Sequence, residues 1–400
     1  MKLVLMGCGQ MGRGAAYALA RDPRVSCLTL IDRDGGRADG LARWLEPHGD
    51  CRILVADDVA DALADSDAVA VALPWAGTRS AIDAAAAAGI PIASITRPPA
   101  AQLSELDAVA TAAGIPVLLP IGLEPGLTEL FALDVARRLD EVAALEIRCG
   151  GIPATPRPPW GYTAFFGGEQ ANHLPIAQRR SLAIKDGRTV SQLRFSGLET
   201  RDVPGVGRLE GYHDGMVPWL ARHPALAAAD CTQKTLRWPG FAGAVTELAD
   251  LGLLDETPVV VDGVSVSPLR VVENVLAPRL RAGSEDEDIV VLEVTGHGRA
   301  DADGRAATAS ALLVDRFDRS TGLSAMTRTT GFTLASATAM LAEGTVSATG
   351  WLRPHEALSA THFTRMKADL AALGVRWTTT AEDPAAASPP SSVTTGGTPA

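Results

Sequence analysis

The chain opens with Lys2-Leu-Val-Leu-Met6-Gly7-Cys8-Gly9-Gln10-Met11-Gly12, an apolar run that leads directly into a loop with three glycines. The apolar residues predict a buried strand, and the Ala-rich stretch that follows predicts a helix over 10–21. In such a loop Gly7 permits the tight turn, Gly9 lets the backbone approach a phosphate, and Gly12 permits close helix–sheet packing. The spacing therefore predicts a strand–turn–helix unit that binds phosphate groups at the helix N-terminus.

A second expected strand, Cys27–Asp32, ends in an acid 20 residues after Gly12. A carboxylate at this position can accept hydrogen bonds from both hydroxyls of an adenosine ribose. The loop, the helix and Asp32 together predict a dinucleotide site, and the carboxylate favours NAD because it would repel the 2′-phosphate of NADP. Arg33 and Arg37 can neutralise that phosphate, so NADP is not excluded. We also expect Leu73 and Pro74, at the end of the fourth strand, to contact the nicotinamide half.

Short apolar runs alternate with Ala-rich helical stretches through the first 120 residues. This alternation predicts βαβ units and an α/β fold of the Rossmann type, a doubly wound parallel sheet covered on both faces. Strands are expected at Lys2–Met6, Cys27–Asp32, Arg52–Val55, Ala68–Leu73, Pro91–Ser94 and Pro116–Leu118, and helices over 10–21, 35–46, 58–65, 77–88 and 102–113.

The pattern changes after residue 123 and predicts a second, α+β domain with a mixed or antiparallel sheet. We expect residues 1–123 and about 331–380 to form the dinucleotide-binding domain, 124–330 a substrate and dimerisation domain, and 381–400 a disordered tail. In the second half we expect helices at 240–254, 266–280, 331–343 and 354–373, strands at 287–300, 306–317 and 322–329, and a turn at 301–304.

The composition argues against several classes of protein. The 400 residues include 47 acidic and 36 basic side chains, a net charge of −11, which argues against nucleic acid or an anionic membrane as the partner. No run of about 20 apolar residues would span a bilayer, and the N-terminus does not read as a secretory signal. The five scattered cysteines fit a cytoplasmic protein without a disulfide framework. The histidines show no metal-binding spacing, so no metal is expected.

Several segments after residue 121 share distinctive Gly, Pro and aromatic patterns: Gly122-Leu-Glu-Pro-Gly-Leu127, Cys149-Gly-Gly-Ile-Pro153, Pro159-Trp-Gly-Tyr162, Val203-Pro-Gly-Val-Gly207, His213-Asp-Gly-Met216, Lys234-Thr-Leu-Arg-Trp-Pro-Gly240 and Asp288–Val294. Together they resemble the saccharopine dehydrogenase superfamily, and most closely its lysine 6-dehydrogenase branch. The resemblance covers roughly residues 1–375 and implies a nucleotide-binding domain built from both chain ends, a central substrate domain whose sheet often supports a homodimer, and C–N oxidoreduction on a small amino acid.

The resemblance also bears on individual residues. Glu124 stands where saccharopine reductases usually carry Asp, and Cys149 matches a cysteine before their Gly-Gly pair. A tyrosine that they often show after the fifth strand is absent, because this chain reads Ser94-Ile-Thr96. This difference weakens the inference that the chain uses saccharopine as its substrate, and it favours oxidation of a simple primary amine.

Amine oxidation needs a proton acceptor, because an alkyl ammonium with a pKa near 10.4 has no lone pair to assist hydride loss. Glu124 is the first candidate for the base or for holding the amine, although it also suits the N-terminus of an expected helix over 126–138. His213 and Asp214 are expected at a helix start, as a proton shuttle and its neighbour, or Asp214 as an N-cap. Tyr162 can place its hydroxyl in the cleft or serve as a lid residue.

An amino-acid substrate also carries a carboxylate. Arg237 is a candidate bidentate partner for it, with Lys234 assisting, unless strand alternation turns both toward solvent. Cys149 is expected to line the substrate site as a small packed residue, since amine oxidation needs no thiol nucleophile.

These observations predict an NAD(P)-dependent enzyme that oxidises the side-chain amine of a basic amino acid, foremost L-lysine, to 2-aminoadipate 6-semialdehyde and ammonia. Three alternatives stay open at this point. They are a saccharopine- or carboxynorspermidine-type reductive condensation, a cyclodeaminase-like lyase that recycles NAD, and a non-catalytic NAD-binding regulator.

Overall fold

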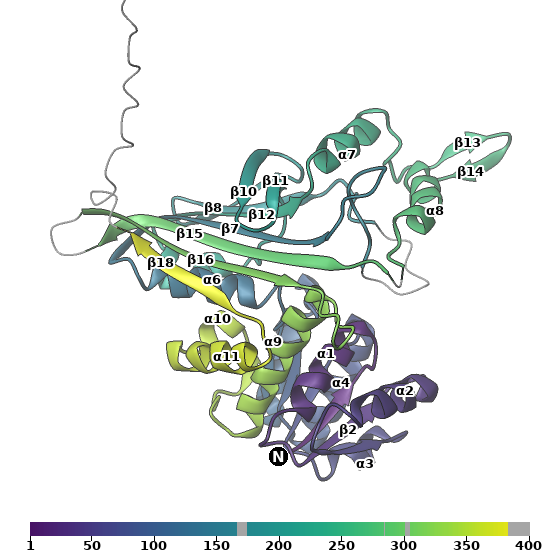
Figure 1. The fold of residues 1–400 in the computed structure, drawn as a ribbon, viewed down its shortest axis with the longest axis vertical. Helices are drawn as coiled ribbons and strands as arrows, with labels where there is room; N and C mark the ends of the chain where they lie inside the picture. The colour runs from purple at the N-terminus through teal and green to yellow at the C-terminus, as the bar shows by residue number, and fades with distance from the viewer. Residues whose placement is uncertain (166–173, 284, 301–304, 383–400) are drawn as a thin grey trace, which may run out of the picture.

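The computed structural model describes residues 1–165, 174–283, 285–300 and 305–382, which form two units (Figure 1). The lower unit in this view combines the purple and blue N-terminal segments with green and yellow segments from near the C-terminus. The upper unit, built from the middle of the chain, is dominated by long strands.

The lower unit contains a seven-stranded sheet with the order β17-β6-β5-β4-β1-β2-β3, and all of its strand pairs are parallel. The order reverses direction between β1 and β4, which is where open α/β sheets leave a crevice at the carboxyl ends of the strands. This confirms the Rossmann-type prediction. Its strands are β1 (Lys2–Met6), β2 (Cys27–Ile31), β3 (Arg52–Val55), β4 (Ala68–Val71), β5 (Ile92–Ser94), β6 (Pro116–Leu118) and β17 (Gly350–Leu352).

Helices cover both faces of this sheet because its strands are apolar on both sides. In β1, Leu3 and Leu5 belong to one core, whereas Val4 and Met6 belong to the other. The first core includes residues of α1 (Gln10–Ala20), α2 (Gly35–Leu45), α9 (Ala325–Ala342) and α11 (Ala360–Ala372), and the second includes residues of α3 (Val59–Leu63), α4 (Trp75–Ala88) and α5 (Leu103–Ala113).

Helix α9 corrects one expectation, because residues 322–329 were expected to form a strand and the helix begins at Ala325. The carboxylate of Asp288 accepts hydrogen bonds from the backbone N–H groups of Ala325 (2.6 Å) and Met326 (2.9 Å), which fixes the helix start. Tertiary packing overrides the strand propensity of the threonines. The helix crosses α1 so closely that a Cβ on Gly331 would lie 2.5 Å from the backbone N of Ala15.

The upper unit is a nine-stranded mixed sheet, as expected for the second domain. Its main path is β10-β11-β12-β7-β15-β16-β18, with β8 and β9 attached at β12; β12 and β7 are parallel and the other pairs antiparallel. The strands are β7 (Glu141–Pro153), β8 (Arg180–Lys185), β9 (Arg188–Leu193), β10 (Glu199–Val203), β11 (Gly207–His213), β12 (Asp230–Arg237), β15 (Asp288–Ala300), β16 (Arg305–Arg316) and β18 (Trp377–Glu382).

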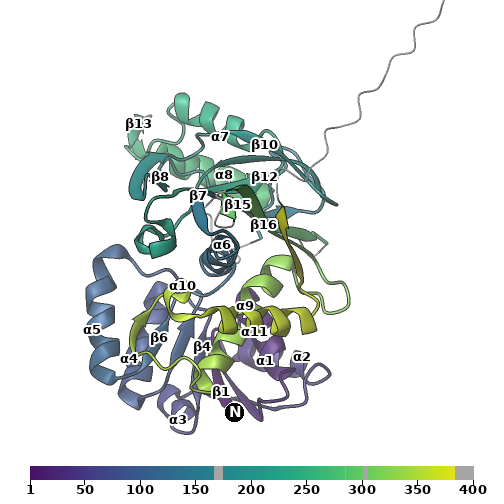
Figure 2. The ribbon, with the colours of Figure 1, turned by 90° about the vertical axis from the view of Figure 1, so that its left-hand side faces the viewer.

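Helix α6 (Leu127–Ala136) lies between the two sheets (Figure 2). Its Phe131 packs against Phe363 of α11 and Trp377 of β18, with ring centroids 5.8 and 4.9 Å apart. The two units therefore share one continuous core. The remaining helices are α7 (Phe241–Asp250), α8 (Pro268–Leu280), α10 (Pro354–Ala357) and the short 3₁₀ turns Ala100–Gln102, Leu220–Arg222 and Pro224–Leu226, and a separate hairpin pairs β13 (Val259–Val261) with β14 (Val264–Val266).

Segments near the C-terminus contribute one strand to each of the two sheets. Strand β17 extends the parallel sheet beside β6, whereas β18 pairs with β16 at the edge of the mixed sheet. Residues 381 and 382 belong to β18; the rest of the expected tail and the expected turn at 301–304 lie outside the described residues. Among the helices in the described ranges, none is long and apolar enough to cross a membrane.

Candidate active site

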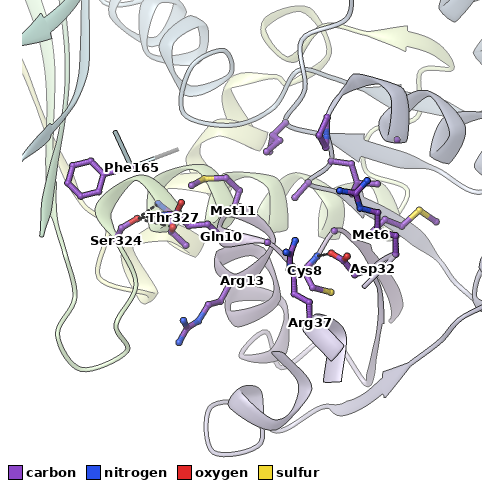
Figure 3. Close-up of a pocket in the computed structure, with 18 of the residues that line it drawn as sticks. Met6, Cys8, Gln10, Met11, Arg13, Asp32, Arg37, Phe165, Ser324 and Thr327 are labelled. Atoms are coloured by element: carbon purple, nitrogen blue, oxygen red, sulfur yellow. Dashed lines mark hydrogen bonds between the residues drawn. The ribbon is translucent and has the colours of Figure 1, made fainter. Parts of the chain in front are cut away.

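A cleft of about 1510 Å³ lies at the carboxyl ends of β1, β2 and β4 and extends to residues of the upper unit (Figure 3). It is larger than the 300–1,000 Å³ typical of drug-sized ligands, so it has room for a dinucleotide. Eight of the nine residues that the sequence assigned to the cofactor line it: Gly7, Gly9, Gln10, Met11, Asp32, Arg33, Leu73 and Pro74.

The glycine loop has the geometry that a pyrophosphate requires. Gly7 has a φ of +99°, and a Cβ on Gly12 would lie only 1.8 Å from the backbone O of Gly7, so neither position admits a side chain. Around Gly9, by contrast, no atom lies within 4 Å of an added Cβ. This open position leaves the backbone accessible from the cleft.

Helix α1 begins at this loop without a side-chain cap and without an acid in its first turn. Its first amides therefore have no side-chain acceptor, and the helix N-terminus carries a partial positive charge. An anionic phosphate bound in the cleft would satisfy both features. The residues present thus fit a dinucleotide.

Asp32 lines the cleft next to the glycine loop. Its carboxylate accepts hydrogen bonds from the backbone N–H of Cys8 (2.8 Å) and of Asp34 (3.0 Å), which fix its position beside the glycine loop. Arg33 and Arg37 also line the cleft and are solvent-exposed. The arrangement places one carboxylate and two guanidinium groups near the expected adenosine ribose.

Residues of both units line the part of the cleft farther from Asp32. The Thr96 hydroxyl donates to the backbone O of Leu73 at 2.5 Å and so ties the loop after β5 to the loop after β4. Phe165 and Ser324 face this region (Figure 3), and Ser324 accepts a 3.5 Å hydrogen bond from the Gln10 side chain.

A second, smaller recess of about 170 Å³ is lined by charged side chains from both units. Arg97 comes from the loop after β5, Glu124 from the loop after β6, and Glu129 from α6. The mixed sheet contributes Gln233 from β12 and Arg179 from the segment before β8. Pro125, Gly215, Met216 and Val217 complete the lining.

Glu124 is solvent-exposed within the recess but surrounded by protein on most sides. This crowding, together with the negative charges of Asp214 and Glu129, raises the pKa of Glu124 to about 7. The amide of Gln233 donates a hydrogen bond to Glu124 Oε1, and the buried Cys149 thiol lies within hydrogen-bonding reach. Glu124 therefore has the pKa and the access of a proton acceptor near neutrality.

Burial raises the pKa of Cys149 well above its ordinary value, and the neighbouring Glu124 adds to the rise. The thiol therefore stays protonated at neutral pH and is no nucleophile. Cys149 is packed in the interior beside Glu124 and lines neither the cleft nor the recess.

Asp214 was expected at a helix start, and this was wrong: it directly follows strand β11, and the next helical turn begins at Leu220. Its carboxylate instead accepts hydrogen bonds from Arg179 and Arg194, each at 2.8 Å, and from the Thr235 hydroxyl at 3.3 Å. Burial alone would raise the pKa of Asp214, but the two guanidinium groups outweigh it and hold that pKa below its usual range. Asp214 is therefore ionised at neutral pH and holds Arg179 and Arg194 beside the recess.

His213 is the last residue of strand β11, and its side chain lies on the opposite side of that strand from Asp214. Its Nδ1 lies 3.1 Å from the Ser196 hydroxyl, and the side chain lines neither cavity. Burial and the nearby Lys234 charge lower its pKa. The structure does not bring His213 to Glu124.

Strand alternation separates the two expected carboxylate-binding residues, because positions three apart on a strand face opposite sides. Gln233 and Thr235 of β12 turn toward Glu124 and Asp214. Lys234 turns the other way and forms an ion pair of 2.7 Å with Glu199. Lys234 is therefore not placed to assist Arg237.

Arg237 lies on the same side as Gln233, in an aromatic environment. Its Nη1 donates to the backbone O of Leu236 (2.9 Å) and of Gly151 (3.3 Å), and its guanidinium lies 5.4 Å from the Tyr162 ring. Tyr162 is buried against Phe241, and burial raises its pKa. Neither Arg237 nor Tyr162 lines the cleft or the recess.

Sequence reasoning missed four polar residues at the recess: Arg97, Glu129, Gln233 and Arg179. For Glu129 a signal existed, since it is a polar position inside the mostly apolar helix α6, and the structure buries it. Gln233 is buried too, but it belongs to the mostly polar strand β12, so no such signal existed for it. Burial raises the pKa of Glu129 to about 7, although a hydrogen bond from the backbone N–H of Gly126 acts to lower that pKa. In the part of the chain that the structure describes, no three His, Cys, Asp or Glu side chains gather as a metal site.

Comparison with known proteins shows which family has this architecture. The family described as "Saccharopine dehydrogenase C-terminal domain" matches residues 122–374, which is more than half of the chain. The chain belongs to the saccharopine dehydrogenase family. The match includes the Glu124 loop, every strand of the mixed sheet except β18, and helix α9.

Two curated members of the saccharopine dehydrogenase family are similar in sequence, both named "Saccharopine dehydrogenase [NADP(+), L-glutamate-forming]". The protein from Pyricularia oryzae is 28% identical over 167 residues, 38% of this chain and 36% of the relative. The protein from Saccharomyces cerevisiae is 26% identical over 277 residues, 64% of this chain and 58% of the relative. The matches thus span less than two thirds of these relatives.

A solved structure of apo saccharopine dehydrogenase (L-Glu forming) from Saccharomyces cerevisiae superposes with a TM-score of 0.77 over 95% of this chain and 99% of that chain. At 20% identity, this likeness shows that the two proteins share the fold.

Proposed function

We propose that this protein is an NAD(P)-dependent dehydrogenase that oxidises the side-chain amine of a basic amino acid, with L-lysine as the preferred substrate. Lysine, oxidised cofactor and water would give 2-aminoadipate 6-semialdehyde, ammonia, reduced cofactor and a proton. The observation that carries the proposal is Glu124, a solvent-accessible carboxylate with a pKa of about 7 in a small recess that shares the β5 loop with a dinucleotide-sized cleft.

The chemistry that a bound nicotinamide supplies is acceptance of a hydride from the amine-bearing carbon. Glu124 would take the proton from the substrate ammonium, which frees the nitrogen lone pair to assist that transfer. Gln233 holds the carboxylate in place through its hydrogen bond to Oε1. Once it has released this proton to solvent, the same carboxylate can deprotonate the water that attacks the iminium carbon.

The size of the recess favours a small substrate. At about 170 Å³ it is well below the 300–1,000 Å³ of sites for drug-sized ligands. Saccharopine joins two amino acids and carries three carboxylates, each of which needs a cationic or hydrogen-bonding partner. At this recess Arg179 already pairs with Asp214, while Arg97 forms no ion pair with any residue that the structure describes. One open guanidinium suits one carboxylate.

For the cofactor we propose NAD ahead of NADP. The carboxylate of Asp32 lines the ribose end of the cleft, where it would repel a 2′-phosphate. Arg33 and Arg37 line the same region and supply the opposing argument, and both curated relatives carry NADP(+) in their names. A titration with each nucleotide decides between them.

A saccharopine-type reaction is the second candidate, because family membership and the names of both relatives favour it. In that reaction an amino acid and an aldehyde condense, and the imine is reduced. Its requirement for a second amine substrate separates it from lysine oxidation.

The test is a set of parallel assays with NAD or NADP and with lysine, ornithine or 1,5-diaminopentane, in which reduced cofactor and ammonia are both measured. Equal amounts of NADH and ammonia from lysine support the proposal. Oxidation of NAD(P)H only when glutamate and the semialdehyde are both present supports the saccharopine-type reaction. Ammonia without accumulated NADH indicates a lyase that recycles its cofactor.

We further propose that the protein is a homodimer, as the family resemblance implies, and that it is cytoplasmic, which its five scattered cysteines favour. Light scattering coupled to size-exclusion chromatography tests the assembly state, and a monomer mass would contradict it.

A further inference from the structure

Arg97 is a charged side chain at the recess that no motif of the sequence singled out. It is solvent-exposed on the loop after β5, its Nη2 lies 3.4 Å from the backbone O of Met216, and its guanidinium lies 5.8 Å from the Trp219 ring. It forms no ion pair with the described residues. Most of its hydrogen-bond donors therefore remain available to a ligand.

The charges around Arg97 favour an anion. Asp214 is held by two guanidinium groups, Arg179 and Arg194, which leaves an excess of positive charge there. Burial raises the pKa of Glu124 and of Glu129 to about 7, which reduces the negative charge that they carry at neutral pH. Arg97 and Arg179 line the recess with these two carboxylates, and Arg194 pairs with Asp214 beside it.

The position of Arg97 relates the recess to the cleft. Ile95 lines the cleft and Arg97 lines the recess, and two residues of chain span at most about 7 Å. Glu124 lines the recess together with Arg97, so a lysine whose carboxylate lies at Arg97 can run its four-carbon stem past Glu124 toward the cleft. A molecule with a carboxylate at one end and an amine at the other matches this layout.

We propose that Arg97 binds the α-carboxylate of the substrate, so that the recess recognises an amino-acid head group and selects basic amino acids over simple diamines. A planar guanidinium pairs with a carboxylate through two parallel hydrogen bonds, which gives geometric selectivity as well as affinity. The inference rests on the proposed function for the reaction at the far amine, but the carboxylate contact can be measured without turnover.

Binding of L-norleucine tests the contact directly, because norleucine has the head group and stem of lysine but no side-chain amine to oxidise. Isothermal titration uses the protein saturated with NAD or NADP, whichever binds. The wild-type protein should bind norleucine, and norleucinamide, which lacks the carboxylate, should bind about ten-fold more weakly or worse. Arg97→Gln should lose at least about ten-fold in norleucine affinity, and Arg97→Lys should lose less because it keeps the charge.

Two matched variants sharpen the result. Arg208→Gln removes an exposed arginine that forms an ion pair with Asp202, and it should leave norleucine binding unchanged. Arg237→Gln tests the residue that the sequence favoured for the carboxylate. Loss of binding in Arg237→Gln with full binding in Arg97→Gln would overturn the proposal, and so would a wild-type protein that does not distinguish norleucine from norleucinamide.

Turnover provides the second readout. The ratio of kcat/KM for lysine to that for 1,5-diaminopentane should fall at least about ten-fold in Arg97→Gln, through a higher KM for lysine. An unchanged ratio would contradict the proposal. If norleucine binds as expected but lysine is not oxidised, the carboxylate contact stands and the proposed function fails.

Discussion

The carboxylate of Asp32 accepts a hydrogen bond of 2.8 Å from the backbone N–H of Cys8, which ties the end of β2 to the glycine loop after β1. The acid that would bind the ribose and the loop that would bind the pyrophosphate are therefore fixed relative to each other. Two parts of the sequence 24 residues apart act as one preformed surface.

Asp32→Asn tests the nucleotide preference. Asparagine keeps an oxygen that can accept from Cys8 but removes the charge that would bind ribose hydroxyls and repel a 2′-phosphate. We expect the Kd for NAD to rise about ten-fold, since a hydrogen bond to a charged group contributes about 1.5–3 kcal/mol, while the Kd for NADP stays constant or falls. Titration calorimetry measures both. Asp34→Asn, at the neighbouring helix cap, is the control, and equal effects of the two substitutions would refute the ribose contact.

Two glycine substitutions separate binding from folding. Gly9→Ala adds a methyl group where no atom lies within 4 Å, so the melting temperature should change little while dinucleotide affinity falls at least ten-fold, roughly the effect of losing one hydrogen bond to a charged group. Gly12→Ala would place its Cβ 1.8 Å from Gly7 O, and we expect it to cost more than about 3 kcal/mol of stability. Thermal unfolding and nucleotide titration of both variants provide the check. Full affinity in Gly9→Ala would show that the phosphates lie elsewhere.

Glu124→Gln should reduce kcat by about 100-fold or more, because the amide cannot accept a proton from the substrate. In the wild-type enzyme, kcat/KM should rise with pH through about 7, as Glu124 loses its proton and becomes a base. The measurement is a pH–rate profile of both proteins. An unaltered turnover in the variant would exclude Glu124 from the chemistry.

Glu129→Gln should move that rise in kcat/KM to lower pH, because the negative charge of Glu129 contributes to the raised pKa of Glu124. Glutamine can still accept the hydrogen bond from Gly126, so the start of α6 should be preserved. A profile that coincides with the wild-type profile would show that the two carboxylates do not interact.

The same substitution should change how stability depends on pH. Folding raises the pKa of Glu129 from about 4.5 to about 7, so the stability linked to its protonated form is complete below pH 4.5 and is lost as the pH rises through 7. Glu129→Gln removes this loss. Its melting temperature relative to that of the wild-type protein should therefore increase between pH 5 and 8, and a constant difference would contradict the assignment.

Much of the fold was predictable because its signals are local. The strand and helix boundaries of the first 120 residues agree with the expected ones to within a few residues, since each βα unit carries its own apolar strand and glycine or capping residue. The misread segment at 322–329 shows the opposite case. The start of α9 depends on Asp288, a carboxylate 37 residues away in sequence, and no local pattern reveals that contact.

The site was predictable only where chemistry follows a motif. The glycine loop and Asp32 line the cleft, and Glu124 lines the recess with Cys149 within hydrogen-bonding reach. Arg97, Gln233 and Arg179 reach the recess from a β5 loop, a strand of the mixed sheet and the segment before β8, so only the packing of the two units brings them together. The position of Lys234 was, by contrast, open to prediction, since its three-residue separation from Arg237 on a strand already implies opposite faces.

We propose that Glu124 deprotonates a lysine side-chain amine beside a bound nicotinamide. The most direct measurement is the stoichiometry of a lysine oxidation assay, run with the wild-type enzyme and with Glu124→Gln. We predict one NADH and one ammonia for each lysine consumed by the wild-type enzyme, and almost none of either from the variant. Wild-type enzyme that binds the nucleotide yet releases neither product from lysine would contradict this account.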